Sequence, residues 1–182
     1  ALLGVSGSGK SSLISIINGS ELRYSGSIKI NNIDSYKLSK RDRKKIGTIW
    51  QDLRLINELT VGQNINTGLL TRKNIFWALL NMSRSLKTEN LLRIIKLLDL
   101  PYSLIDKNIG SISGGERQRA AIAKVIIQEP DLLLADEPLS NLDPKLAKKI
   151  LGLLLNNKNI CNSINFPDTV IVSLHKPELI HN

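Results

Sequence analysis

The chain has 182 residues, of which 42% are hydrophobic and 23% charged, a balance that excludes disordered and fibrous proteins and predicts a folded core. Lysine and arginine total 25 against 16 aspartate and glutamate, a net charge of +9, but the basic residues are scattered and indicate a solvated surface rather than a nucleic-acid-binding block. The single cysteine, Cys161, excludes an intramolecular disulfide and favours a reducing compartment, and no apolar run reaches the roughly 18 to 20 residues of a membrane-spanning helix.

Hydrophobic spacing divides the chain into alternating strands and helices. Short β-branched or alternating runs predict strands, and apolar residues at helical spacing predict helices. Gly19 can close the first helix in a left-handed conformation, and the residue before Pro130 is pushed out of the helical region. In chain order we predict a strand at 1–3, a helix at 10–18, strands at 27–32 and 46–51, helical structure at 60–100, a helix at 114–128, a strand at 132–136, a helix at 144–155 and a strand at 169–174.

This alternation predicts an α/β fold with a largely parallel sheet. We expect one domain over 1–182, with a sheet core formed by 1–56 and 129–182 and a mostly helical subdomain at about 57–128 inserted between them. A parallel sheet needs cover on both faces and neighbours on both sides, yet the chain opens inside a strand. We therefore expect a fragment that is truncated at its N- and C-terminal ends.

Residues 4–11, GVSGSGKS, match the phosphate-binding pattern G-x-x-x-x-G-K-[ST] between a strand and a helix. The glycines permit backbone angles closed to other residues, so consecutive amide groups can converge on an anion at a helix N-terminus. Lys10 would reach the β- and γ-phosphates of a nucleotide, and the Ser11 hydroxyl would coordinate Mg²⁺. The residues expected to hold the nucleotide are Gly4, Ser6, Gly7, Ser8, Gly9, Lys10, Ser11 and Ser12.

Two adjacent carboxylates follow the apolar run at 132–135. Since successive strand residues point to opposite faces, Asp136 and Glu137 should have different roles. Asp136 can join the Mg²⁺ shell together with Ser11, while Glu137 can accept the proton of a water in line with the γ-phosphate. The alternative, an acidic pair in a solvated turn, is disfavoured beside a phosphate loop.

A second glycine turn, Ser113-Gly114-Gly115, precedes or opens the helix predicted at 114–128. Ser113 and Glu116 have the spacing of a capping box, which explains these two residues without any ligand. The box leaves the glycines unexplained, since glycine weakens a helix unless another group must come close. A second anion at this helix N-terminus would explain them.

Together these motifs resemble those of the ATP-binding-cassette (ABC) ATPases, the nucleotide-binding subunits of membrane transporters. ISGGE is similar to the family signature, with Glu116 where glutamine is common, and LLLADEP is similar to its acidic strand motif. Gln51 resembles the glutamine of the loop that senses Mg²⁺ and touches the membrane subunit. Asp143, in SNLD, resembles the loop that crosses the dimer interface, and His175 the switch histidine that contacts the γ-phosphate.

The resemblance implies a P-loop NTPase (RecA-like) fold, in which a parallel sheet core carries an inserted α-helical subdomain. It implies an ATPase with ATP and Mg²⁺ as cofactors. Two such subunits stack head to tail, so that each ATP lies between the phosphate loop of one and the signature of the other. The catalytic residues implied are Lys10, Gln51, Glu137 and His175; the Mg²⁺ ligands are Ser11, Gln51 and Asp136; and the residues that reach the other subunit's ATP include Ser113, Gly114, Gly115 and Asp143.

The resemblance also implies partners: a second ATPase subunit, transmembrane permease subunits at the cytoplasmic face of the cell membrane and, in an importer, a solute-binding protein. No direct nucleic-acid partner is expected. A DNA-associated cassette ATPase is the less favoured alternative, because chromosome-organising members separate the two glycine motifs by a long coiled coil, whereas a compact segment joins Gln51 to Ser113 here. A nucleotide-binding fragment without turnover is a further alternative.

The cargo prediction depends on residues 59–80, which include Asn64, Gly68 and the pair Phe76-Trp77. This stretch is similar to importers of phosphonate or related oxyanions. The spacing of the aromatic pair and Leu80 is explained equally well by the core face of a helix. A lipoprotein-release or peptide-export cassette is the alternative.

Overall fold

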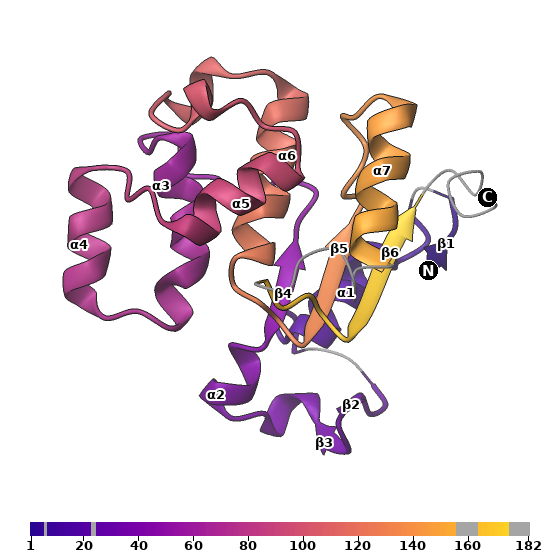
Figure 1. Cartoon of the computed structure of the whole chain (residues 1–182). Helices are drawn as coiled ribbons and strands as arrows, with labels where there is room; N and C mark the ends of the chain where they lie inside the picture. Colours follow the sequence, from indigo (N-terminus) through magenta and orange to yellow (C-terminus); the bar gives the residue numbers. More distant parts are fainter. Residues whose placement is uncertain (6, 23–24, 156–163, 175–182) are drawn as a thin grey trace.

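The computed structural model describes residues 1–5, 7–22, 25–155 and 164–174, and Figure 1 shows their arrangement. In this part of the chain, four parallel strands form one sheet in the spatial order β1, β6, β5, β4. The predicted α/β fold with a parallel sheet core is therefore confirmed. The strands are β1 (Leu2–Leu3), β4 (Ile46–Ile49), β5 (Leu132–Asp136) and β6 (Thr169–Leu174).

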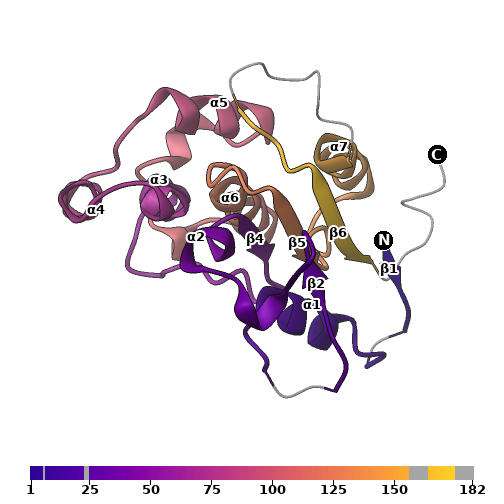
Figure 2. The same cartoon turned by 90° about the horizontal axis from the view of Figure 1, so that it is seen from below.

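Helices cover both faces of this sheet. Helix α1 (Lys10–Asn18) lies against one face, and α6 (Gly114–Ile126) and α7 (Pro144–Leu155) lie against the other (Figure 2). Gly19 closes α1 in a left-handed conformation with φ of 81°, as predicted. Between these helix layers β5 and most of β4 are buried, whereas Leu3 of β1 is 50% exposed.

Strand β5 is buried along its whole length, as its apolar sequence requires of a central parallel strand. Leu132 and Leu134 pack with Ile14 of α1, whereas Leu133 and Ala135 belong to the core cluster that contains residues of α6 and α7. Successive strand residues point to opposite faces, so the same alternation directs Asp136 to the α1 side of the sheet. Burial of each leucine contributes about 1.5–3 kcal/mol.

The segment predicted as helical at 60–100 is broken into α3 (Val61–Asn66), α4 (Ile75–Ser83) and α5 (Glu89–Leu97). These helices lie to one side of the sheet, on the left in Figure 1. Helix α6 packs against α3 and α5 and also against β4, so it connects this helical part to the sheet. Short 3-10 segments lie at Ser35–Lys37, Thr67–Thr71, Tyr102–Leu104 and Ile109–Ser111.

The strand predicted at 27–32 is wrong in extent. Asn31 and Asn32 have φ values of 50° and 63°, a left-handed pair that forms the two-residue turn of a hairpin. The turn joins β2 (Lys29–Ile30) to β3 (Ile33–Asp34) as an antiparallel pair. A short helix, α2 (Lys40–Arg43), follows in the basic stretch and was not predicted.

Other predicted boundaries shift by one or two residues or hold. The strand predicted at 46–51 ends at Ile49, so Gln51 lies in the turn after it, and the helix predicted at 114–128 ends at Ile126. The strand predicted at 1–3 is limited to Leu2–Leu3. The helices at 10–18 and 144–155 and the strands at 132–136 and 169–174 are confirmed.

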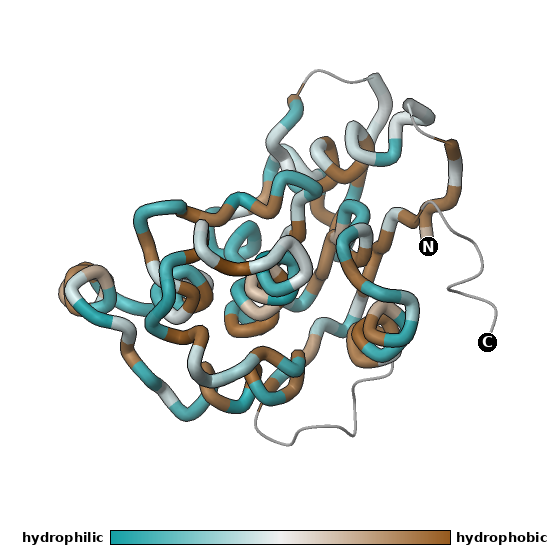
Figure 3. The backbone as a smooth tube through the Cα atoms, turned by 90° about the horizontal axis from the view of Figure 1, so that it is seen from above, coloured by the Kyte–Doolittle hydropathy of each residue, from teal (hydrophilic) through white to brown (hydrophobic). Residues whose placement is uncertain are grey.

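Helix α4 does not place its aromatic pair in the core. Phe76 is 78% exposed and Leu80 44% exposed, and only Trp77 of the three packs partly against the core cluster. The helix lies at the outer edge of the molecule, at the left of Figure 3, although its sequence is largely apolar. The interpretation of this spacing as the core face of a helix is therefore wrong.

Candidate nucleotide site

The predicted site residues lie on loops that follow the carboxyl ends of the parallel strands. The glycine-rich loop follows β1, Gln51 follows β4, and Asp136 and Glu137 stand at the end of β5. Open α/β sheets bind ligands at this edge, because the loops converge beyond the strands. Two predicted site residues, Ser6 and His175, lie outside the described residues, as does the single cysteine.

The glycine-rich loop has the backbone that its glycines permit. Gly7 and Gly9 have φ values of 79° and 87°, in the left-handed region that favours glycine, and Gly9 immediately precedes α1. The Lys10 ammonium donates to the carbonyls of Gly4 and Val5 at 2.8 and 2.9 Å, so its charge lies inside the loop. The loop therefore presents a cation and a helix N-terminus to the same space. The predicted serines Ser8, Ser11 and Ser12 are exposed on the loop and the first turn of α1.

The three residues predicted to surround Mg²⁺ line one pocket. Ser11, Gln51 and Asp136 come from α1, the turn after β4 and the end of β5, and they border a hollow of about 400 Å³. Trp50 and Arg54 complete one side of it. Residues far apart in the sequence thus meet beside the phosphate loop.

The donor types around this pocket fit Mg²⁺. Hydroxyl, amide and carboxylate oxygens are hard ligands, and Mg²⁺ is usually held by one or two carboxylates together with water and phosphate oxygens. Within the described ranges no group of three or more histidine, cysteine, aspartate or glutamate side chains is placed to hold a metal ion. The pocket offers one carboxylate, one hydroxyl and one amide, a donor set that leaves positions on Mg²⁺ for water and phosphate oxygens.

The two adjacent carboxylates occupy different environments. Asp136 is 3% exposed, and its Oδ1 accepts a hydrogen bond of 2.7 Å from the hydroxyl of Ser173. Glu137 is partly exposed and has a left-handed backbone with φ of 49°. Its N–H donates to the same Ser173 hydroxyl at 3.0 Å. Sequence reasoning missed Ser173, because nothing in the local sequence shows that β6 places it beside Asp136.

The second glycine turn begins helix α6 with the predicted capping box. The backbone N–H and the hydroxyl of Ser113 donate to Glu116 Oε2 at 2.7 and 2.8 Å, and the N–H of Glu116 donates to Ser113 Oγ at 3.3 Å. The backbone hydrogen bond from Ser113, followed by the side-chain one, lowers the pKa of the Glu116 carboxyl. Ser113 itself is exposed, so a second molecule can approach it.

The two glycines of this turn have different surroundings. A Cβ on Gly115 would lie 3.1 Å from the carbonyl oxygen of Asn141, so packing within the chain already favours glycine there. A Cβ on Gly114 would meet no atom within 4 Å. Packing thus accounts for Gly115, and only Gly114 still calls for a second anion.

The loop between the acidic pair and α7 packs on helix α6. The buried Gln118 donates from Nε2 to the carbonyl of Pro138 at 2.6 Å, and its Oε1 accepts from Asn141 at 3.2 Å. Asp143 is exposed and caps α7 by accepting from the N–H of Leu146 at 3.0 Å. Gln118, which sequence reasoning did not select, thus connects the signature helix to the loop after Glu137.

The loop that carries Gln51 is fastened to helix α6. Leu53 and Arg54 have left-handed φ values of 60° and 45°, which non-glycine residues adopt only when their surroundings impose them. The Arg54 guanidinium lies 3.7 Å from the ring centre of Trp50, a cation–π contact. Lys124 of α6 donates to the Arg54 carbonyl at 2.8 Å, and burial, with a smaller effect of the Arg54 charge, lowers the pKa of Lys124.

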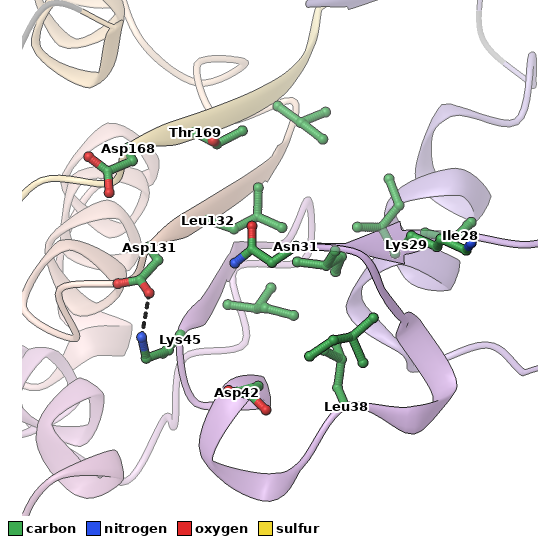
Figure 4. A pocket seen from close by; sticks show the side chains of 15 residues that line it. Ile28, Lys29, Asn31, Leu38, Asp42, Lys45, Asp131, Leu132, Asp168 and Thr169 are labelled. Atoms are coloured by element: carbon green, nitrogen blue, oxygen red, sulfur yellow. Dashed lines mark hydrogen bonds and ion pairs between the residues drawn. The ribbon is translucent and has the colours of Figure 1, made fainter.

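A second hollow of about 440 Å³ lies at the opposite edge of the sheet, beside the hairpin β2–β3 (Figure 4). It is bordered by the first residues of β4, β5 and β6 and by the ion pair between Lys45 and Asp131, at 2.7 Å. None of the predicted site residues lines it. The candidate site is therefore the hollow at the carboxyl ends of the strands.

A profile of the ABC transporter family matches residues 1–140 of this chain. The phosphonates import ATP-binding protein PhnC 1 of Ruegeria sp. (strain TM1040) is 35% identical over 181 residues, which cover 96% of this chain and 67% of the relative. The ABC transporter ATP-binding protein YxdL of Bacillus subtilis (strain 168) is 36% identical over 184 residues, 97% of this chain and 65% of the relative. A dimeric structure of a post-hydrolysis state of the ATP-binding cassette MJ0796, bound to ADP and Pi, matches with a TM-score of 0.77 at 28% identity and covers 97% of this chain and 74% of that one.

The matched region extends from the phosphate loop through the signature turn to beyond the acidic pair. No described helix combines the length and the apolar content that crossing a bilayer requires. On the family profile, the similarity along nearly the whole chain and the shared fold, the chain belongs to the ABC transporter family, as an ATP-binding subunit that hydrolyses ATP.

Proposed function

We propose that this subunit powers import of phosphonate or a related oxyanion through membrane permease subunits, by hydrolysing ATP in the pocket beside the phosphate loop. The observation that carries the nucleotide site is the meeting of Ser11, Gln51 and Asp136 in one hollow next to Lys10. The nucleotide phosphates lie along the amides of residues 4–12, including Ser6, and replace the loop carbonyls as partners of the Lys10 ammonium. Ser11, Gln51 and Asp136 would hold Mg²⁺ in this pocket.

Glu137 acts as the general base for hydrolysis. Bound Mg²⁺ supplies positive charge that offsets the charge developing on the phosphate oxygens. Glu137 is partly exposed at the strand end and can take the proton of the attacking water, while Asp136 stays buried and fixed. To His175, which follows Leu174 in the sequence, we assign the contact with the γ-phosphate.

The second partner of the triphosphate is another copy of the subunit. Ser113 is exposed at the N-terminus of α6, and the open space around Gly114 lets a phosphate approach the amides of this turn. Gly115 and Asp143 contribute to the same interface, head to tail. When the dimer binds ATP, the Ser113 hydroxyl stops donating its hydrogen bond to Glu116 and donates it to the γ-phosphate of the ATP bound by the other subunit. The dimeric MJ0796 cassette supports this arrangement.

Movement passes to the permease through the loop that carries Gln51. Lys124 joins this loop to helix α6, whose first residues form the signature turn. A change at either the pocket or the dimer interface therefore acts on the same helix. We place the subunit at the cytoplasmic face of the cell membrane, bound to the permease, with residues 57–128 as the helical subdomain beside a sheet core of 1–56 and 129–182.

The cargo assignment is supported by relatives named as phosphonates import proteins, among them those of Ruegeria and Synechococcus, which are each 35% identical to this chain. A solute-binding protein would deliver such a cargo to the permease. The residues at 59–80 do not by themselves carry the assignment. A Cβ on Gly68 would lie 2.0 Å from the carbonyl oxygen of Lys124, so packing explains this glycine.

Growth on a single phosphorus source tests the cargo. We expect deletion of the subunit in its host to abolish growth on methylphosphonate and to leave growth on inorganic phosphate intact. Wild-type protein should restore growth, and the matched Lys10→Ala variant should not, because it loses the cation that holds the phosphates. Unimpaired growth of the deletion strain on methylphosphonate would exclude this cargo, and a defect in lipoprotein release or peptide export would support the export alternative.

A further inference from the structure

We propose that Ser173 is a positioning residue for ATP hydrolysis, which fixes the carboxylate of Asp136 and the backbone of Glu137 through one hydroxyl group. The inference rests on the proposed roles of these two residues at the metal ion and the attacking water. Ser173 touches neither of these groups directly. It acts through Asp136, the last residue of β5, and through Glu137, which follows it.

The sheet register places Ser173 beside the acidic pair. Strands β5 and β6 are parallel, with Leu134 opposite Ile171 and Asp136 opposite Ser173. Leu134 and Ile171 both pack on the α1 side of the sheet. Side chains alternate between the two faces of a sheet. The pair Asp136 and Ser173, two residues further along, therefore also lies on the α1 side, near the phosphate loop that leads into α1.

The hydrogen bonds define the direction in which the hydroxyl points. A backbone N–H can only donate, so the Glu137 amide at 3.0 Å directs the Ser173 oxygen as its acceptor. The single hydroxyl proton is then donated to Asp136 Oδ1 at 2.7 Å. Ser173 is 0% exposed and Asp136 3% exposed, so a lost hydrogen bond here is not readily replaced by water.

The left-handed backbone of Glu137 gives this contact its importance. A φ of 49° is unfavourable for a residue with a side chain and persists only when the surroundings hold it. The bond from the Glu137 N–H to Ser173 fixes the peptide plane between the two carboxylate residues. The orientation of that plane determines where the Glu137 side chain leaves the strand end.

The structure supplies a matched pair of variants. Threonine and valine at position 173 have nearly the same shape, and both are favoured in strands, but only threonine carries a hydroxyl. Ser173→Ala removes the hydroxyl without adding volume. Comparing Ser173→Thr with Ser173→Val therefore separates loss of the hydrogen bonds from any effect of a bulkier side chain.

The first measurement is amide hydrogen exchange at Glu137 by NMR, in the whole protein without nucleotide. We expect Ser173→Ala and Ser173→Val to speed exchange at this amide by about tenfold or more, and Ser173→Thr to keep it protected. Amides in the middle of β5 should be unaffected in all three, because they bond within the sheet. Equal exchange at Glu137 in all variants would overturn the proposed contact.

The second measurement is steady-state hydrolysis of ATP at several Mg²⁺ concentrations. We expect the alanine and valine variants to lose kcat by about 10- to 100-fold, as is usual when a partner of a metal-binding carboxylate is removed, and to need more Mg²⁺ for half-maximal rate. The KM for ATP should change far less, since the phosphate loop is untouched. Ser173→Thr should recover most of kcat.

The two proposals fail in different measurements. Full turnover by Ser173→Val, or equal loss in the threonine and valine variants while all remain folded by thermal denaturation, would overturn the role of Ser173. Full turnover by Glu137→Gln would instead overturn the proposed base. Hydrogen exchange at the Glu137 amide is measured without nucleotide. Even if Glu137 is not the base, this measurement still decides whether Ser173 holds the backbone of Glu137.

Discussion

The carboxylate of Glu116 brings a negative charge to the turn that we propose receives an anion. Hydrogen bonds from Ser113 stabilise its charged form and lower its pKa. The Ser113 hydroxyl donates to Glu116 and is thereby engaged within its own subunit. In the dimer that we propose, closure must overcome both this hydrogen bond and the repulsion between the carboxylate and the incoming γ-phosphate.

Glu116→Gln should strengthen ATP-dependent dimerisation. Glutamine can accept from the Ser113 amide in the same capping box, so helix α6 keeps its cap while the charge is lost. Two like charges about 4 Å apart repel by about 1 kcal/mol in water, which corresponds to a roughly fivefold tighter dimer. Analytical ultracentrifugation in the presence of ATP measures the dimer affinity. Glu116→Ala is the control, because it removes the charge and the helix cap together. An unchanged dimer affinity in Glu116→Gln would contradict the proposed signature site.

The same residue gives a pH dependence of stability. The folded-state pKa of Glu116 lies below its ordinary value of 4.5, so its contribution is fully present above that value and is lost as pH falls through the lowered pKa. Acid titration of unfolding should show this loss in the wild type and not in Glu116→Gln. If both proteins lost the same stability as the pH fell, groups other than Glu116 would cause the acid destabilisation.

At the scale of elements, helix α6 connects the parts of the molecule that must move together. Its first turn carries the signature, Gln118 bonds to the loop after Glu137, and Lys124 bonds to the loop after β4. A rigid helix transmits a displacement at one end to contacts along its length. In the proposed transporter, the loop contacts of α6 are where the nucleotide state would act on the permease.

Lys124→Met tests the fastening of this loop. The substitution keeps the packed side-chain stem and removes the donor to the Arg54 carbonyl, so we expect amides at 51–54 to exchange faster and nucleotide affinity to remain within about twofold. Lys148→Met, at an exposed position of α7, is the matched control and should leave this loop unchanged. Unaltered exchange in Lys124→Met would show that other contacts hold the loop.

The lowered pKa of Lys124 determines whether its contribution to the free energy of unfolding rises or falls with pH. Burial disfavours the charged form in the folded state, so the unfolded chain binds this proton more tightly. Stability contributed at this position therefore rises as pH increases from the lowered pKa toward the ordinary value of 10.5. We expect wild type to gain stability relative to Lys124→Met over that interval, measured by denaturant unfolding at each pH.

At the scale of the whole molecule, the predicted site residues gather at the carboxyl ends of the parallel strands and not at their amino ends. The loops after β1, β4 and β5 converge beside one pocket, whereas the hollow beside the β2–β3 hairpin has none of the predicted site residues. Half of the proposed triphosphate site lies on a second subunit. Turnover should therefore depend on the concentration of the protein.

Glu137→Gln should trap an ATP-bound dimer. The amide cannot take the proton of the attacking water, so we expect turnover to fall by about 100-fold or more while ATP and the dimer persist. Sedimentation and retained nucleotide measure both effects. Adding Lys10→Ala to this variant should abolish the trapped dimer, because the phosphates are no longer held. Normal turnover in Glu137→Gln would contradict the assigned base.

Local chemistry made much of the fold and site predictable. The phosphate loop depends on left-handed backbone angles, which glycines such as Gly7 and Gly9 adopt without steric strain. The start of α6 depends on a capping box between two residues that are three positions apart. The hairpin at Asn31 and Asn32 was also local, but two asparagines are a weaker signal for a left-handed pair than a glycine would be. Such features need only neighbours in the chain.

By itself the sequence determined the alternation of the main strands and helices, the glycine-rich loop before α1, the acidic pair at the end of β5 and the capping box, because each depends on spacing along the backbone; it did not determine the β2–β3 hairpin or α2. The tertiary structure alone decided that Ser173 meets Asp136, 37 residues away, and that the loop after β4 is fastened to Lys124, 70 residues from Arg54. Strand register and helix packing set these contacts, and both result from burying apolar faces over the whole sheet. No local pattern specifies which polar side chains that burial brings together.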